Sequence, residues 1–310
     1  MKNNHSNIKK SKFFLDKNEC VAIPTETVYG LAANAYSNEA TYKIFKLKKR
    51  PKKNPLIVHY YNIKNLKKDC ILNDNFFTLY KKFSPGPLTF VLKLKNKSKI
   101  SKNVTNNKKT LAVRFPKHSL TRKLLKELEY PLAAPSANIS TRISPVSKED
   151  VKDEFGKKIK FVLQGGRSQI GLESTIISLI NKPQILRLGG IEINKINKVL
   201  KTNLKFKNKK MKVTYPGQSK VHYSPGIPIK LNVKNPKSNE AFILVKKRKS
   251  TTKNFYYLSK NNNLKEAARN LYKTLRNIKN KKFKSIAVEE ISNKGFGLAI
   301  NDRLVRASKF

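Results

Sequence analysis

Short apolar segments alternate with amphipathic segments from Cys20 to Lys195, and this alternation restricts the fold more than any other feature of the chain. The apolar segments have the length of strands, whereas the amphipathic segments repeat their apolar residues at helical spacing. Strands that alternate with helices are typical of α/β domains. We therefore predict an α/β fold built on an open, twisted, mixed sheet.

The individual elements follow from the same patterns. Strands are predicted at residues 21–23, 55–59, 88–92, 110–114, 160–163, 174–178 and 184–187. One helix is predicted over residues 40–47, which precede Pro51, and another over residues 120–128, which precede Pro131. A proline after each apolar stripe stops the helix there.

A basic segment separates two folded units. Residues 193–239 contain no acidic residue and several prolines and glycines, which is typical of a linker. Beyond it, strands are predicted at residues 241–245, 255–258 and 285–288, and helices at residues 264–278 and 295–308. The predicted organisation is a first domain over residues 1–200, a linker over residues 201–228 and a small Rossmann-like α/β domain over residues 229–310.

Charge leaves two interpretations open. Lys and Arg outnumber Asp and Glu by 68 to 19, a net charge of +49, which invites a nucleic-acid interpretation. Much of the Lys is accompanied by Asn, however, and this pattern equally indicates a compositional bias without functional meaning. The hydrophobic content of 38% is too high for a disordered basic tail, so the charge is expected to coat folded domains.

Several classes of protein are excluded. The only cysteines are Cys20 and Cys70, without a CxxC pair or a histidine cluster, which argues against a disulfide framework and a structural zinc site. No apolar run follows the basic N-terminus as in a signal peptide, and none approaches the roughly 20 residues of a membrane span. We expect a cytoplasmic protein without a membrane segment.

Two glycine motifs fail as nucleotide signatures. Gly166 and Gly171 have the spacing of a P-loop, but Leu-Glu at residues 172–173 replaces the required Lys and Ser/Thr. A second motif begins at Gly295, where Ile300 occupies the third position of a dinucleotide fingerprint and prevents close helix packing. No GxSxG, HExxH or paired-carboxylate pattern is present, so triad hydrolysis and zinc proteolysis have no support.

Three polar clusters interrupt the apolar strands and turns. They are IPTETVYG at residues 23–30, KKRPKKNPL at residues 48–56 and AAPSANIS at residues 133–140. Lys48 and Arg50 supply cations for phosphate, and Ser136 and Asn138 supply neutral donors and acceptors. Each cluster alone is compatible with a solvated loop. Together they predict a crevice for an anionic ligand at the strand ends of an open α/β sheet.

These clusters also carry a family resemblance. PTETVYGL, KxxxRPxxNPLIVH, TLAVRFP, PLAAPSAN, GLESTI and ILRLGG occur in this order, and the chain resembles the YrdC-like domain of the threonylcarbamoyl-AMP synthase family. YPGQSKVHYSP and the terminal GFGLAINDRLVRAS are similar to the long form of that family, which carries a second, Rossmann-like domain. The resemblance extends from about Ser11 to the C-terminus.

The resemblance implies a nucleotidyltransferase. L-threonine and bicarbonate would form a carbamate, which attacks the α-phosphate of ATP to give threonylcarbamoyl-AMP and pyrophosphate, with Mg²⁺ on the phosphates as the expected cofactor. A separate threonylcarbamoyl transferase complex would then modify an adenosine beside the tRNA anticodon. The surplus of basic residues suggests additional nonspecific affinity for tRNA.

The resemblance also implies site residues. Catalytic positions fall on Lys48, Arg50, Ser136 and Asn138; ATP-binding positions on Arg50, Asn54, Thr110, Ser136, Ser144, Arg187 and Tyr223; and threonine-binding positions on Thr27, His59, Arg114, Ala134 and Ser174. No protein ligand for a metal and no general base are predicted.

Residue chemistry agrees with these assignments. Arg114 can pair with the threonine carboxylate through its planar fork, and Lys48, Arg50 and Arg187 can neutralise phosphate charge. Tyr223 in the HYSPG motif is predicted to close over the nucleotide, so that the linker acts as a lid.

Two alternatives stay open at this point. One is a basic RNA-binding module whose crevice merely holds phosphate. The other is carbamoyl-adenylate chemistry, as in the related domain of hydrogenase-maturation proteins, although the zinc-finger and acylphosphatase segments of those proteins are absent.

Overall fold

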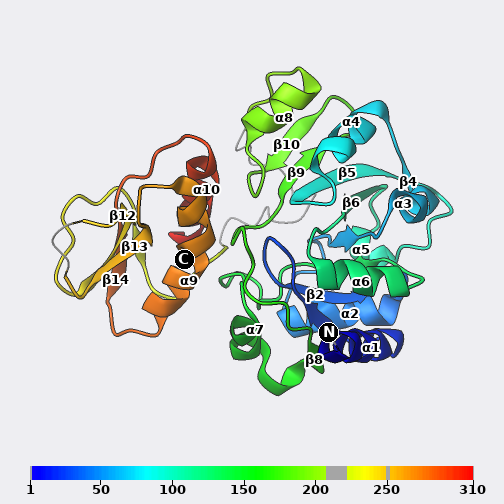
Figure 1. Cartoon of the computed structure of the whole chain (residues 1–310), viewed down its shortest axis with the longest axis horizontal. Coiled ribbons are helices and arrows are strands. Elements are labelled where there is room, and N and C mark those ends of the chain that lie inside the picture. Colours follow the sequence, from blue (N-terminus) through cyan, green and yellow to red (C-terminus); the bar gives the residue numbers. More distant parts are fainter. Residues whose placement is uncertain (1, 207–221, 249–251, 310) are drawn as a thin grey trace.

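The computed structural model describes residues 2–206, 222–248 and 252–309, with side chains from His5 onward. Figure 1 shows a large α/β unit that carries the N-terminus and a smaller α/β unit that carries the C-terminus, with helices α9 and α10 of the small unit facing the large one. Most of the predicted linker, residues 207–221, lies outside the described residues. No helix in the described ranges has the length and hydropathy needed to cross a membrane.

The large unit contains most of the elements. In chain order they are α1 (Lys2–Asp16), β1 (Val21–Ile23), β2 (Gly30–Asn34), α2 (Asn38–Lys48), β3 (Ile57–His59), α3 (Ile63–Asp69), β4 (Cys70–Ile71), α4 (Asp74–Phe83), β5 (Leu88–Leu94), α5 (Lys102–Thr105), β6 (Thr110–Arg114), α6 (Ser119–Glu127), β7 (Leu132–Ala133), α7 (Lys148–Phe155), the 3-10 helix η1 (Gly156–Lys158), β8 (Phe161–Val162), β9 (Thr175–Ser178), β10 (Gln184–Arg187) and α8 (Ile193–Leu200). The predicted strands and helices of this region are all found, with small shifts of their ends.

The sheet of the large unit is mixed. Its order is β10-β9-β5-β6-β3-β7-β2-β1-β8, and β4 pairs with β5. The pairs β3–β6, β5–β9 and β1–β8 are parallel, whereas the other pairs are antiparallel. This confirms the predicted mixed α/β sheet.

Amphipathic helices cover the sheet, as the sequence spacing predicts. On α6, Leu120, Leu124 and Leu125 are buried against β1 residues such as Val21. Burial of each such leucine contributes roughly 1.5–3 kcal/mol. Helix α2 stops at Lys48 because the next residue, Lys49, adopts a left-handed conformation with φ of 49°.

The small unit is a parallel α/β sandwich. It contains β11 (Ile229–Lys230), β12 (Glu240–Lys246), β13 (Phe255–Ser259), α9 (Leu264–Lys279), β14 (Ser285–Val288) and α10 (Phe296–Ala307). Its strands are all parallel, in the order β11-β14-β12-β13. Ala268, Leu271, Leu275 and Ile278 of α9 are buried, as their spacing predicts. The Rossmann-like prediction for this region is thus confirmed at the level of topology.

The acid-free segment begins with a helix. Residues 193–200 belong to this segment but lie within the predicted first domain, and they form helix α8. Ile196 is buried in the core, and α8 packs against α4. The absence of acidic residues conceals a helical apolar repeat, because composition and periodicity are independent properties of a segment.

A buried ion pair joins the two units. Arg303 of α10 donates from Nε to Oε2 of Glu173 at 2.9 Å and from Nη2 to the carbonyl oxygen of Leu188 at 2.7 Å. Tyr272 of α9 donates its hydroxyl to the same carboxylate at 3.0 Å. Arg303, Glu173 and Tyr272 are all buried, so water does not weaken these contacts.

The pair shifts the titration of Glu173. Burial acts to raise the pKa of this carboxyl group, but the guanidinium groups of Arg303 and Arg187 outweigh burial and lower the pKa to about 2. The folded-state pKa is therefore below the unfolded one, which is about 4.3. The stabilisation from this ion pair is fully present above the unfolded-state pKa of Glu173 and is lost as the pH falls through its folded-state pKa.

We expect the free energy of unfolding to show this linkage. The difference in apparent unfolding midpoint between the wild-type chain and Glu173→Gln should be largest near neutral pH and should shrink as the pH falls from about 5 toward 2. Thermal unfolding of both proteins across this range measures it. A difference that stays constant down to about pH 3 would contradict the assignment.

Candidate active site

Two parallel strands align the centre of the candidate site. Strands β3 and β6 pair in a register that places His59 beside Arg114 and Ile57 beside Ala112. Side chains two residues apart on a strand share one face, so all four lie on the same face of the sheet. A pocket lies over this face and is lined by Ile57, His59 and Arg114.

The pocket lies over the sheet face and not at the strand ends, where the polar clusters of the sequence predict a crevice. The rule that ligands bind at strand ends applies to open parallel sheets. Here β7 runs antiparallel to both β2 and β3, so chain turns occur at both edges and polar loops fold over the face. The pocket has a volume of about 540 Å³, counted with its opening to solvent.

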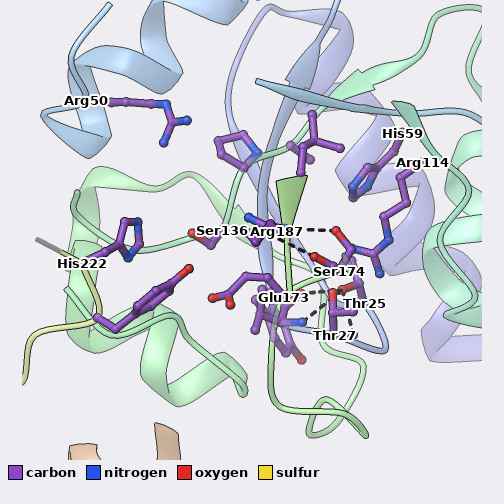
Figure 2. A pocket seen from close by; sticks show the side chains of 17 residues that line it. Thr25, Thr27, Arg50, His59, Arg114, Ser136, Glu173, Ser174, Arg187 and His222 are labelled. Carbon is purple, nitrogen blue, oxygen red and sulfur yellow. Dashed lines mark hydrogen bonds between the residues drawn. The ribbon is translucent and has the colours of Figure 1, made fainter. Parts of the chain in front are cut away.

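Charged and polar side chains occupy different sides of the pocket. Figure 2 shows Arg50 and His222 on one side and His59 and Arg114 on the other, with Arg187 between them. Three of these five side chains, those of Arg50, Arg114 and Arg187, carry positive charge toward a shared space of limited size. Such an arrangement suits an elongated anionic ligand.

Arg114 is held in place by a buried carboxylate. Its Nη2 atom donates to Oε1 of Glu26 at 2.7 Å, and its Nε atom donates to the carbonyl oxygen of Gly86 at 3.3 Å. The other carboxylate oxygen of Glu26 accepts the backbone N–H of Lys117 at 2.9 Å. Nη1 makes no hydrogen bond within the described part of the chain and is available to a ligand carboxylate.

His59 is neutral in this environment. Burial and the adjacent Arg114 charge lower the pKa of His59 well below its usual value. Its Nδ1 atom is buried and has no hydrogen-bond partner among the described residues. Because an unsatisfied buried polar atom is costly, this atom is poised to bind a ligand group.

Hydroxyl groups line the space beside Arg114. The hydroxyls of Thr25 and Thr27 lie 2.8 Å apart, and that of Ser174 lies 2.7 Å from that of Thr89. Arg187 donates from Nη2 to the Ser174 hydroxyl at 3.1 Å. A small ligand with a hydroxyl group finds several donors and acceptors at this end of the pocket.

Arg50 and Arg187 form the second cationic region. Arg50 donates from Nε to the carbonyl oxygen of Asn54 at 3.0 Å and from Nη2 to that of Pro55 at 2.8 Å. Burial and the Arg187 charge lower the pKa of Arg50 to about 9, so it stays protonated at neutral pH. Burial also lowers the pKa of Arg187. An anion placed between the two guanidinium groups would offset the repulsion that lowers the pKa of Arg50.

Lys48 has a different place from the one predicted. Its ammonium group donates to the carbonyl oxygen of Ser136 at 2.6 Å and to that of Asn138, and the side chain is buried. Burial, and then the charge of Arg50, lower its pKa well below the usual value. Lys48 is absent from the pocket lining and organises the loop over residues 136–140.

That loop is built from the third polar cluster. Ser136 lines the pocket and donates its hydroxyl to Oδ1 of Asn138 at 2.6 Å. Nδ2 of Asn138 is bound to the carbonyl oxygens of Ile139 and Arg142. Ala133 and Ala137 of the same cluster are fully buried within the core.

The remaining predicted residues divide into two groups. Thr27, Ala134, Ser174 and Tyr223 line the pocket together with the residues above, whereas Asn54, Thr110 and Ser144 do not. Ser144 is buried and donates to Glu173 at 2.6 Å. Asn54 carries a buried Oδ1 atom without a partner among the described residues.

Thr110 lies at the other end of the strand that carries Arg114. With a rise of about 3.3 Å per residue, the two positions are separated by about 13 Å along β6. They share one face with Ala112 between them. In the parallel register of β3 and β6, Thr110 falls level with Pro55, close to Arg50.

Several residues in the pocket wall or directly behind it were not assigned a role from sequence. Thr25 and Glu26 belong to the PTETVYG motif, Glu173 to GLESTI and His222 to HYSPG, so the motifs contained them without indicating what they contact. Burial is the main cause that lowers the pKa of His222 to about 3, and its Nδ1 atom has no partner in the described ranges.

The site contains no obvious protein ligand set for a metal. Within the described residues, no three His, Cys, Asp or Glu side chains form a cluster suited to a metal ion. The carboxylate of Glu173, which lines the pocket, is already bound by Arg303, Tyr272 and Ser144. The pocket therefore offers a ligand mainly the cationic side chains of the protein.

Comparisons with known proteins cover both units. The family model Sua5_yciO_yrdC, described as telomere recombination, matches residues 14–189. The family model described as threonylcarbamoyl-AMP synthase, C-terminal domain, matches residues 191–309.

Relatives match the chain over nearly its whole length. The chain is 35% identical to the threonylcarbamoyl-AMP synthase of Pyrococcus abyssi in an alignment of 321 positions that covers 96% of this chain and 92% of the relative. It is 34% identical to that of Bacillus subtilis in an alignment of 326 positions that covers 98% of this chain and 94% of the relative.

A solved structure agrees with the fold of both units. The crystal structure of P. abyssi Sua5 complexed with L-threonine superposes with a TM-score of 0.89 at 34% identity, covering 97% of this chain and 94% of that one. The match includes both units. The chain therefore belongs to the family of threonylcarbamoyl-AMP synthases, nucleotidyltransferases that form L-threonylcarbamoyladenylate.

Proposed function

We propose that this chain forms L-threonylcarbamoyladenylate from L-threonine, bicarbonate and ATP, with release of pyrophosphate. The observation that carries the proposal is that one pocket holds cations along its length, with Arg114 at one end, Arg50 at the other and Arg187 between them. A reaction that joins an amino acid to a nucleotide needs binding groups for both in a single pocket. The threonine complex of the P. abyssi relative supports it.

Threonine is assigned to the region around Arg114. The free Nη1 atom and the second hydrogen of Nη2 suit a carboxylate, and Glu26 fixes the guanidinium plane. The hydroxyls of Thr27 and Ser174 can recognise the threonine side chain. Neutral His59 can accept or donate a hydrogen bond without adding charge.

ATP is assigned to the region around Arg50 and Arg187. The face of β6 extends about 13 Å from Arg114 to Thr110, so a nucleotide that lies along the strand reaches both the reacting group and the Asn54–Thr110 level. The unpartnered Oδ1 of Asn54 is an acceptor suited to the nucleotide. Tyr223 lines the pocket, and its closure as a lid stays a prediction.

The chemistry requires charge stabilisation more than acid–base groups. The threonine amine adds to bicarbonate with loss of water to form a carbamate, whose oxygen attacks the α-phosphorus while the bond to the β-phosphate breaks. Arg50 and Arg187 can stabilise the charge that develops there. Mg²⁺ is proposed to arrive as part of the MgATP substrate, in keeping with the cationic pocket. The enclosed pocket can also protect the mixed anhydride from water.

The product is proposed to pass to a tRNA-modifying threonylcarbamoyl transferase complex. This role places the chain where ATP and tRNA occur, in the cytoplasm. The two cysteines, Cys20 and Cys70, are free buried thiols, in keeping with that assignment.

We expect pyrophosphate release to need threonine and bicarbonate together. Arg50→Ala should lower it at least about 100-fold, because one preorganised charge partner of the phosphates is lost. The matched control is Lys52→Ala, which removes an exposed cation from the same loop and should change the rate little. A pyrophosphate assay with each substrate omitted in turn measures both. RNA binding without any such turnover would contradict the proposal.

A second test concerns threonine recognition. Glu26→Ala removes the acceptors that hold Arg114 and the backbone of Lys117, so the KM for threonine should rise at least about fivefold with a smaller change in the KM for ATP. Glu39→Ala removes a carboxylate from an exposed ion pair with Lys43 and serves as the control. Equal changes in both KM values would show that Glu26 is not specific to the threonine region.

A further inference from the structure

We propose that Arg303, in the second unit, is a positioning residue for the nucleotide region of the pocket. It acts by neutralising Glu173 and by supporting Tyr223, two pocket-lining residues that it contacts. The inference rests on the proposed function, since it assigns to the small unit a part in ATP binding.

Three hydrogen-bond donors bind the carboxylate of Glu173. This residue lines the pocket, and its carboxylate receives Nε of Arg303 at 2.9 Å, the Tyr272 hydroxyl at 3.0 Å and the Ser144 hydroxyl at 2.6 Å. Two of these three donors come from the small unit. They occupy most of the lone pairs of a carboxylate that would otherwise face the phosphate-binding cations.

Arg187 would be the alternative partner of Glu173. It donates to the carbonyl oxygen of Ser174 at 3.0 Å and to the Ser174 hydroxyl at 3.1 Å. No ion pair between Arg187 and Glu173 is found among the described residues, where the carboxylate pairs with Arg303. Arg303 thus keeps Glu173 away from Arg187. Without Arg303, the carboxylate would either pair with Arg187 or repel the phosphates, and both outcomes weaken ATP binding.

Arg303 also contacts Tyr223, near the end of the predicted linker. The guanidinium carbon of Arg303 lies 5.0 Å from the ring centroid of Tyr223, and the Tyr223 ring stacks on Tyr272 at 5.7 Å with an interplanar angle of 20°. Tyr223 has a φ of 67°, a left-handed conformation that is rare for an aromatic residue and needs support from its surroundings. The backbone N–H of Ser224 donates to the carbonyl oxygen of Thr141 at 2.9 Å.

Arg303 itself is held from both sides. Its Nη1 atom donates to Asp302 at 2.7 Å and its Nη2 atom to the carbonyl oxygen of Leu188 at 2.7 Å. The side chain is 1% exposed. A guanidinium with every nitrogen bound in a fixed plane can orient the carboxylate, whereas a lysine ammonium would act only as a point charge.

Another ion pair between the units supplies a matched control. Arg276 of α9 donates to Glu154 of α7 at 3.2 Å and to the carbonyl oxygen of Ile143 at 2.6 Å. It joins the same two units and is also largely buried, but neither it nor Glu154 lines the pocket. Loss of Arg276 therefore reports what weaker docking of the units does by itself.

The experiment compares Arg303→Ala, Arg303→Lys and Arg276→Ala in the full chain. Arg303→Ala should raise the KM for ATP at least about tenfold and the KM for threonine less than about threefold, with Arg303→Lys between it and wild type. Arg276→Ala should lower the unfolding midpoint but leave the KM for ATP within about twofold.

A double variant separates positioning from folding. In Glu173→Gln/Arg303→Ala the unpaired negative charge is gone, so the KM for ATP should recover at least about threefold relative to Arg303→Ala. A purely structural role would leave the double variant no better than the single one. Equal effects on both substrates, or an equal effect of Arg276→Ala, would also overturn the inference.

A direct measurement of nucleotide binding tests the inference independently of the proposed reaction. Titration calorimetry with a non-hydrolysable ATP analogue measures nucleotide affinity without turnover. Weaker binding by Arg303→Ala supports the inference even if the wild-type chain fails to release pyrophosphate with threonine and bicarbonate. Unchanged binding overturns the inference while leaving the proposed function standing.

Discussion

Buried guanidinium groups impose the constraint on which the rest of this structure depends. A buried positive charge is tolerated only where its donors find acceptors. Glu26 serves Arg114, Glu173 serves Arg303, and the backbone carbonyl groups of residues 54 and 55 serve Arg50. These acceptors lie on loops, so satisfying the charges also fixes the loops that wall the pocket. Binding chemistry and loop order are thus consequences of the same contacts.

The net charge of +49 divides into two populations with different physics. A few buried cations converge on the pocket, where charges are poorly screened and act strongly on a ligand. The surplus lies on exposed surfaces such as Lys64, Lys67 and Lys68 of α3, where salt screens each charge within about 8 Å. Composition alone cannot distinguish these populations, which is why the charge by itself left nucleic-acid binding and compositional bias equally open.

Helices and strands were predicted correctly where the apolar residues of the sequence followed a strong pattern. The apolar runs of β5, β6 and β12 and the helical stripes of α6 and α9 were all anticipated. Strand β2 is built largely from alanine and glycine, and β7 has only the two residues Leu132 and Ala133. Neither was anticipated, because small residues and very short segments carry little apolar signal. Helix α7 was also missed, although its capping box, Ser147 with Asp150, is readable in the sequence.

By itself, the sequence determined the α/β class, the two units and the polar motifs, because these depend on local periodicity and on residues adjacent in the chain. Only the tertiary structure decided which of those residues face the pocket. Lys48 and Asn138 organise a loop, whereas Glu26, Glu173 and His222 take part in the site or its walls. Glu173 and Arg303 are 130 residues apart, and no local pattern connects them. Their contact exists because two separately folded units bury complementary charges against each other, and that is a property of packing.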